Sequence, residues 1–150
     1  MGTEGTKRSF RDVRTTNAAI AAIWSAWMDV PNWKAWDVGL RDARAETPLH
    51  LGARSTITDR SGRVVPFEIV RFEEGWSYAI ANPLPLGGRL VVERTITATD
   101  PTGFRHDVRF EGFGGVLLAP ILGRQFRVML PEAMDRLAAL AEAAAPEGRT

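Results

Sequence analysis

The chain has 150 residues, the length of one ordinary domain, and a fold of this size removes about 70% of the extended chain's surface from water. Hydrophobic residues make up 45% and charged residues 25% of the sequence, which excludes an intrinsically disordered chain. The formal net charge of +1, with cations dispersed among acids, argues against a nucleic-acid partner, and the lack of cysteine excludes disulfides, thiol nucleophiles and Cys-type zinc sites.

The sequence shows no segment that would target the chain to a membrane. The longest apolar run, Val116–Leu122, is too short to span a bilayer, and the N-terminal residues lack the apolar core of a secretory signal. We therefore expect a cytoplasmic protein without integral membrane association. We expect one domain over residues 1–150, with frayed ends at 1–7 and 145–150.

The first third of the chain predicts one strand followed by two short helices. Residues 9–15 alternate loosely around Phe10 and Val13, as a first strand would. Apolar residues at helical spacing then predict an amphipathic helix over 18–28, and a further helical turn over 32–36 follows the interruption at Pro31. Four of the five tryptophans lie between positions 24 and 36, so this helix pair must pack on a large apolar surface.

From Val38 onward the apolar pattern changes to period two, which indicates strands. Turn residues at 60–62 and 100–103 separate consecutive strands into hairpins, so the strands form an antiparallel meander with one face to be covered. The predicted strands span residues 38–46, 53–59, 64–72, 76–82, 89–99 and 104–112.

The C-terminal segment 113–144 carries an apolar stripe at spacings of three and four, which predicts a helix. Pro120 with Gly123 is one weak point, and Pro131 predicts a bend near Leu130. This is the only element long enough to cover the sheet. The fold class is therefore α+β: a curved antiparallel sheet of about seven strands around a long C-terminal helix, with two short helices after the first strand.

Parity along the last two strands places a cation and an imidazole on the inner face. With the strands in register across their turn, His106 lies opposite Ile96 and diagonal to Arg94. An unpaired buried guanidinium is costly, so we expect Arg94 to meet a carboxylate, cavity water, or an anionic or oxygen-rich ligand. The alternatives are a bulge or an ion pair with Glu68.

These inward residues are the candidates for chemistry. His106 has an ordinary pKa near 6.5 and could act as a general acid or base, while Arg94 could stabilise an enolate or phenolate. Tyr78 and Asn82 could add hydrogen bonds to a ligand. Equally, His106 could be a hydrogen-bonded core residue, and Tyr78 could serve packing alone.

Apolar residues around them are candidates for the walls of a cavity. Trp33 and Trp36, beside Pro31, could line its entrance, and the glycine-rich segment 112–115 is either a flexible lid with Phe113 as its plug or a simple chain reversal. The alternative is that the same side chains fill a solid core. The full set of apolar candidates is Trp33, Trp36, Val92, Val108, Phe110, Phe113, Phe126 and Met129.

We predict no metal site and no cofactor. His50 and His106 lie in unrelated elements, and no His, Asp or Glu spacing matches a metal site. No Ser–His–Asp arrangement or phosphate-binding glycine loop is apparent either.

One set of residues is similar to a known family: Trp24, Asp29, Trp33, Trp36, Gly52, His106, Val108, Phe110, Gly112, Leu130–Met134, Leu137, Leu140 and Glu142. Over about residues 8–142 the chain resembles the polyketide cyclase/dehydrase-type family of the START-like (SRPBCC, birch-pollen-allergen-like) superfamily. The resemblance implies a helix-grip fold, in which the sheet grips a helix around a deep hydrophobic cavity that in such proteins holds lipids, aromatic polyketides, hormones or quinones. No catalytic motif is shared across the superfamily, so the resemblance implies a cavity and no catalyst.

Two functional hypotheses follow. The first is a protein that binds a hydrophobic small molecule, aromatic or lipid-like, as a monomer or homodimer. The second is a cyclase or dehydratase that uses His106 and Arg94 on a polyketide-like substrate. A protein-interaction module has less support, because the fold already uses the apolar stripes.

Overall fold

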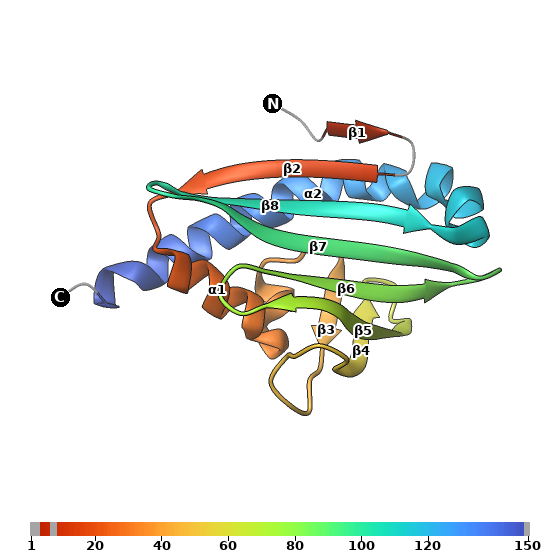
Figure 1. Cartoon of the computed structure of the whole chain (residues 1–150), viewed down its shortest axis with the longest axis horizontal. Helices are drawn as coiled ribbons and strands as arrows, with labels where there is room; N and C mark the ends of the chain where they lie inside the picture. The colour runs from red at the N-terminus through yellow and green to blue at the C-terminus, as the bar shows by residue number, and fades with distance from the viewer. Residues whose placement is uncertain (1–3, 7–8, 149–150) are drawn as a thin grey trace.

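The computed structural model describes residues 4–6 and 9–148. It contains an eight-stranded antiparallel sheet that curls around a long C-terminal helix, with two short helices at one end (Figure 1). The strand order is β1-β2-β8-β7-β6-β5-β4-β3, so β2 pairs with β8 and the remaining strands form a meander. The elements are β1 (Glu4–Thr6), β2 (Ser9–Thr16), α1 (Ile20–Met28), the 3-10 helix η1 (Val30–Ala35), β3 (Leu40–Ala43), β4 (Arg54–Asp59), β5 (Val64–Glu73), β6 (Ser77–Leu84), β7 (Gly88–Thr99), β8 (Thr102–Glu111) and α2 (Gly112–Gly148).

The predicted helix-grip fold is confirmed, and the differences lie at the ends of the chain. Seven strands match the seven expected, and the three-residue β1 adds an eighth at the edge of the sheet beside β2. Residues 4–6 and 145–148, which we expected to fray, lie in β1 and in the last turns of α2. Residues 1–3, 7 and 149–150 of the same prediction lie outside the described residues.

The core forms where the second half of α2 meets the inner face of the sheet. The apolar stripe of this helix is buried as its spacing predicted. By length and composition alone, the stretch Gly112–Ala144 could also cross a membrane. Here its buried stripe instead packs in the core, on β2, β7, β8 and α1; its members are Leu130, Ala133, Met134, Leu137 and Ala141.

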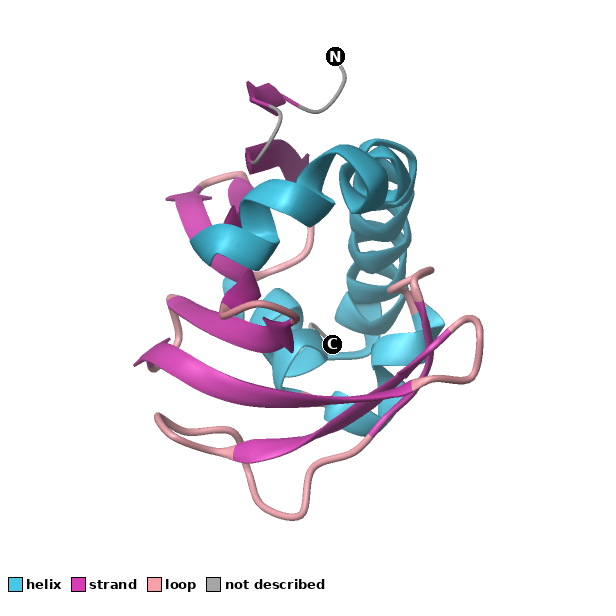
Figure 2. Ribbon diagram, turned by 90° about the vertical axis from the view of Figure 1, so that its right-hand side faces the viewer, coloured by secondary structure: helices cyan, strands magenta, loops and turns pink. Residues whose placement is uncertain are grey.

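The helix α2 begins earlier than predicted and runs unbroken through Pro131. Its first turns lie at an angle to the rest of the helix, as Figure 1 and the end-on view in Figure 2 show. In the same part of the helix Gly123 packs directly on the ring of Phe10 in β2, where an added Cβ would lie 2.7 Å from the ring.

The glycine-rich segment 112–115 is the first turn of α2, so the prediction of a lid or a loose reversal here is wrong. The glycines are needed because two backbones touch. A Cβ on Gly114 would lie 1.6 Å from the carbonyl oxygen of Pro85, and one on Gly88 would lie 2.4 Å from the backbone nitrogen of Gly115. The amide of Gly114 also donates to the carbonyl of Leu86 at 3.3 Å. The start of α2 is therefore fixed against the β6–β7 turn.

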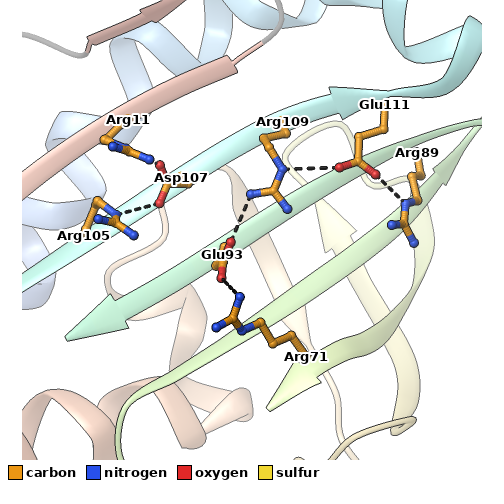
Figure 3. Close-up of polar contacts among 8 residues, drawn as sticks. All are labelled: Arg11, Arg71, Arg89, Glu93, Arg105, Asp107, Arg109 and Glu111. Carbon is orange, nitrogen blue, oxygen red and sulfur yellow. Dashed lines mark hydrogen bonds and ion pairs between the residues drawn. The ribbon is translucent and has the colours of Figure 1, made fainter. Parts of the chain in front are cut away.

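The outer face of the sheet carries a network of arginines and carboxylates (Figure 3). Odd-numbered residues of β7 and β8 point outward, and Glu93 and Asp107 each accept from two arginines. Such surface pairs contribute little stability individually. They show, however, that the odd-numbered side chains of β7 and β8 lie on a polar outer face. The even-numbered side chains of these strands therefore face α2. The network comprises Arg11, Arg71, Arg89, Glu93, Arg105, Asp107, Arg109 and Glu111.

The close backbone contact at the start of α2 predicts that a side chain added at Gly114 lowers the stability of the fold. Gly114→Ala must push the helix away from Pro85, and we expect a loss of about 2–3 kcal/mol in the free energy of unfolding, as for other overpacked sites. Urea denaturation measures it. Gly39→Ala is the control, because an added Cβ there makes ordinary contacts with side chains alone, the flexible end of Met129 at 3.4 Å and a carboxylate oxygen of Asp37 at 3.5 Å. Equal stability of the Gly114→Ala variant and the parent would contradict this packing.

Candidate functional site

A cavity of about 250 Å³ lies between the curled sheet and α2. The residues that α2 contributes recur at helical spacing, on the face turned toward the sheet. Strand residues from the inner faces of β3 to β8 form the opposite wall. Of the residues singled out in the sequence, the cavity is lined by Trp33, Trp36, Asn82, Val92, Arg94, His106, Val108, Phe126 and Met129.

The two ends of this cavity differ in exposure. Arg63 of the β4–β5 hairpin and Gln125 of α2 are exposed, so they mark the mouth. At the other end Trp33, Trp36 and His106 are each about 1% exposed. The two tryptophans therefore line the deep end, and the prediction that they line the entrance is wrong. A ligand entering past Gln125 would meet the buried polar groups last.

A second hollow lies outside this site. It is a surface groove of about 1000 Å³ between α1, the β7–β8 turn and the last turns of α2, lined largely by alanines and short polar side chains. Although it is the larger of the two, neither Arg94 nor His106 lines it. We assign the candidate site to the smaller cavity, because only that one combines apolar walls with a few inward polar groups.

The polar residues at the deep end form a row across three strands. In the observed register Tyr78 of β6 lies opposite Arg94 of β7, which lies opposite His106 of β8. The prediction of His106 opposite Ile96 is wrong, because the turn pairs the two strands one position away from the predicted register and a bulge between Ile96 and Ala98 shifts the pairing by one more. The shift brings the guanidinium and the imidazole closer together than the unbroken register would.

The guanidinium of Arg94 is almost fully buried, at 4% exposure, and is enclosed by aromatic rings. Its central carbon lies 4.8 Å from the ring centre of Trp36, 5.2 Å from that of Trp33 and 5.6 Å from that of Tyr78, distances typical of cation–π contacts. Nη1 donates to the hydroxyl of Tyr78 at 2.6 Å, and Nη2 donates to Asp37 at 3.4 Å. The expected alternative partner, Glu68, instead pairs with Arg54.

Two N–H donors at this end lack a protein acceptor. The Nε of Arg94 and the indole nitrogen of Trp36 are both buried without a hydrogen-bond partner among the described residues. Buried donors are nearly always paired, because an unpaired one costs about 1–3 kcal/mol. An oxygen atom of a ligand or an ordered water is the kind of group that would satisfy them.

The hydrogen bonding of His106 fixes its tautomer. The indole N–H of Trp27, which can only donate, lies 3.2 Å from Nε2 of His106, so Nε2 is the acceptor and Nδ1 carries the hydrogen. Burial, followed by the charges of Arg94 and Arg14, lowers the pKa of His106 well below 6.5. The ring is therefore neutral at physiological pH, and its one free lone pair is occupied. His106 is suited to donate a hydrogen bond from Nδ1 and is poorly suited to act as a general base.

Asp37 is the site residue that the sequence did not reveal. It lies two residues after the end of η1 and lines the cavity beside Arg94. Burial raises the pKa of its carboxyl, and the charge of Arg94 opposes that rise. Burial likewise raises the pKa of Tyr78, so its phenol stays protonated and donates to the carbonyl of Trp27 at 3.4 Å. The sequence did contain a signal for it: Arg94 was expected to need a carboxylate, and Asp37 lies next to the Trp cluster in sequence.

Three predicted ligand contacts lie elsewhere. Tyr78 is fully buried behind the cavity wall, where it supports Arg94. Phe110 is buried between Phe10 and Phe126 in edge-on aromatic contacts. Phe113 is 65% exposed on the outside of α2, because this residue is helical and not part of a lid. Asn82 does line the cavity, and its amide donates to the carbonyl of Pro66 at 3.0 Å.

Metal chemistry has no candidate ligand set in this region. Within residues 4–6 and 9–148, no three His, Asp or Glu side chains gather closely enough to hold an ion. At the deep end of the cavity, the polar groups nearest a ligand are the donors of Arg94, Trp36 and His106, and the carboxyl of Asp37.

Comparison with solved structures finds the same fold in other proteins. Protein MLL2253 from Mesorhizobium loti superposes with a TM-score of 0.73 at 17% identity, covering 91% of this chain and 98% of its own. DynU16, from the dynemicin biosynthetic locus, gives 0.68 at 20% identity over 93% of this chain and 49% of its own. The di-domain ARO/CYC StfQ, from the steffimycin biosynthetic pathway, gives 0.61 at 16% identity over 94% and 51%.

These likenesses establish the fold, a helix grip, and this chain spans about half the length of the two biosynthetic proteins. No family model matches the sequence, and no curated protein matches it significantly.

The buried imidazole predicts a pH-dependent stability. Because the pKa of His106 is lower in the folded chain than its ordinary 6.5, the unfolded chain binds the extra proton as the pH falls below 6.5. The stability present above pH 6.5 is then lost by up to about 1.4 kcal/mol per pH unit. Urea unfolding of the parent and of His106→Gln, which keeps an acceptor for Trp27, measures the difference. A variant with the same slope as the parent below pH 6.5 would contradict the assignment.

Proposed function

We propose that this protein binds a small hydrophobic molecule, with an aromatic or otherwise planar body and at least one oxygen acceptor, in the cavity between the sheet and α2. The observation that carries the proposal is the combination of apolar walls with unpaired buried donors at one end. Val92, Val108 and Met129 would contact the body of the ligand. Its oxygen would accept from Arg94 and Trp36.

The size of the cavity limits the ligand. About 250 Å³ lies just below the range of about 300–1,000 Å³ that is usual for drug-sized ligands. A molecule of one to three fused rings is of suitable size, whereas a long acyl lipid would need the wall to move. Flexible Phe126 and Met129 on α2 are the side chains best able to adjust.

The structural neighbours favour an aromatic ligand over other hydrophobic ones. One of them comes from the dynemicin biosynthetic locus, and another is described as a di-domain ARO/CYC protein from the steffimycin biosynthetic pathway. Because these proteins share little sequence identity with this chain, the likeness shows a common fold and does not identify a ligand. The choice of an aromatic ligand therefore depends on the aromatic lining of the deep end, Trp33 and Trp36, together with this association.

A matched pair of substitutions on α2 tests the proposal. Met129→Trp places an indole in the cavity and should weaken binding of the probe 2-naphthol at least tenfold, because roughly one ring's volume is lost. Val128→Trp, one residue earlier and 71% exposed, should leave binding unchanged. Isothermal titration calorimetry gives both affinities. Binding by the Met129→Trp variant equal to that of the parent would place the ligand elsewhere.

The second candidate function is a cyclase or dehydratase acting on a polyketide-like substrate. The observation that favours it is the convergence of Arg94 with the Nδ1–H of His106, which would stabilise an enolate or phenolate oxygen. A general base at Nε2 is disfavoured because Trp27 already donates there. The base would then be Asp37, whose carboxyl has a raised pKa and lines the same cavity.

The two functions differ in what loss of the cation does. In a catalyst, Arg94→Met should lower cyclisation of a poly-β-ketone thioester by about 100-fold or more, the usual effect of removing an oxyanion donor, and should lower 2-naphthol affinity far less. In the 2-naphthol measurement alone, the double variant Arg94→Met/Asp37→Asn controls for an unpaired carboxylate. If the parent forms no cyclised product in this assay, the catalytic alternative fails while the binding proposal stands.

A further inference from the structure

The outward side of the first half of α2 is apolar and exposed. Its exposed large apolar side chains, together with one from the neighbouring turn, make up what we call the outer patch: Leu86, Phe113, Val116, Leu117, Ile121 and Val128. These side chains are 43% to 71% exposed. Large apolar residues scattered singly on a surface are ordinary, but a set gathered on one helix is typical of an interaction site.

The helical residues of the outer patch follow a single stripe. Phe113, Leu117, Ile121 and Val128 lie four, four and seven positions apart, which places them on one side of the helix. The opposite side of the same segment lines the cavity through Leu122, a neighbour of Ile121 in sequence. This half of α2 is thus apolar on both sides, and the fold uses only the inner one.

Leu86 shows that the exposure is not incidental. It adopts φ of 60°, the left-handed conformation that favours Gly, Asn or Asp, and the next residue, Gly87, has φ of 72°. Leucine is strained in this conformation. Because its side chain is 66% exposed, burial of apolar surface does not offset the cost of that strain. A residue that breaks the local rule without a packing benefit indicates a role at the surface.

The backbone contact described above makes the patch rigid. The carbonyl of Leu86 accepts from the amide of Gly114, next to Phe113. The β6–β7 turn and the start of α2 therefore present their apolar residues at the same end of the molecule, the end that faces the viewer in Figure 2.

The charge of this segment identifies the partner. Residues 112–131 contain two arginines and no acid. Arg124 is exposed, within the stripe, and has no carboxylate partner among the described residues. Arg127 lies over the ring of Phe10, 5.1 Å from its centre. The acids that flank the segment are already paired, Glu111 with Arg89 and Glu132 with Arg136.

A second copy of the chain would fit this surface poorly. Across a two-fold axis the stripe would meet its own copy, and both copies would bring arginines to the interface with no acid from residues 112–131 to offset them. A membrane rich in anionic lipid instead offers phosphate for the arginines and acyl chains for the apolar residues.

We propose that the outer patch, with Arg124 and Arg127, docks this protein on the surface of an anionic lipid bilayer. The helix lies in the plane of the interface, with its outer side in the headgroup region and its inner side against the cavity. Nothing crosses the bilayer, because the second half of α2 remains buried against the sheet. This surface is independent of the binding proposal and would function with an empty cavity.

Co-sedimentation with vesicles tests the proposal. The full chain should bind vesicles of equal parts phosphatidylglycerol and phosphatidylcholine, and should bind pure phosphatidylcholine vesicles much more weakly, with salt reducing the difference. The double variant Leu86→Asn/Ile121→Gln should lower the partition coefficient at least tenfold, because two large apolar side chains are lost from the interface. Asn suits the left-handed position of residue 86, so the variant should fold normally.

Two further variants separate the contribution of charge from a general effect of losing exposed apolar surface. Arg124→Gln should reduce the preference for anionic over neutral vesicles. Trp76→Gln removes an exposed aromatic residue that lies just before the start of β6, whereas Leu86 follows the end of that strand. It should change binding by no more than about twofold, as surface substitutions outside an interface do. An equal loss in Trp76→Gln and in the double variant, equal binding to both vesicle types, or no binding would each overturn the proposal. A dimer abolished by the double variant, in a chain that ignores vesicles, would assign the patch to a second copy.

Discussion

The burial of the Arg94 guanidinium is the constraint on which the site depends. Removing this charge from water is costly, and the structure offsets the cost with three aromatic rings, the Tyr78 hydroxyl and a long contact to Asp37. These partners come from β6 and from the segment around η1, so the cation ties the helical end of the molecule to the middle of the sheet. The compensation is incomplete, since Nε lacks an acceptor. That unmet donor is the physical reason to expect a ligand oxygen.

The helix α2 serves two purposes along its length, and the division explains its composition. Its second half is an ordinary amphipathic core helix, buried through Leu130, Met134 and Leu137. Its first half is apolar on both sides and begins with glycines that permit backbone contact with the β6–β7 turn. A rigid start to the helix fixes the wall that carries Phe126 and Met129. The same rigidity holds Phe113 and Leu86 on the outside.

The sequence predicted the parts of this structure that depend on periodicity. The order of strands and helices, the inward parity of Arg94 and His106, and the role of the C-terminal stripe all followed from spacings within one element. The predictions failed where contacts between distant elements determine the structure. The bulge after Ile96, the contact of Gly114 with Pro85 and the pairing of Arg94 with Asp37 each require knowing which backbones meet. Composition suggested a lid at 112–115 because glycine permits both flexibility and close packing, and only the tertiary contact distinguishes the two.

The central claim is that the cavity accepts a planar molecule whose oxygen meets the donors at its deep end. A crystal structure of the protein grown with 2-naphthol tests this most directly. The account predicts density for the rings between Met129 and Val92, with the hydroxyl oxygen within hydrogen-bond distance of Arg94 or the indole nitrogen of Trp36. Side chains closed over an empty site, or a ligand bound only in the groove beside α1, would contradict it.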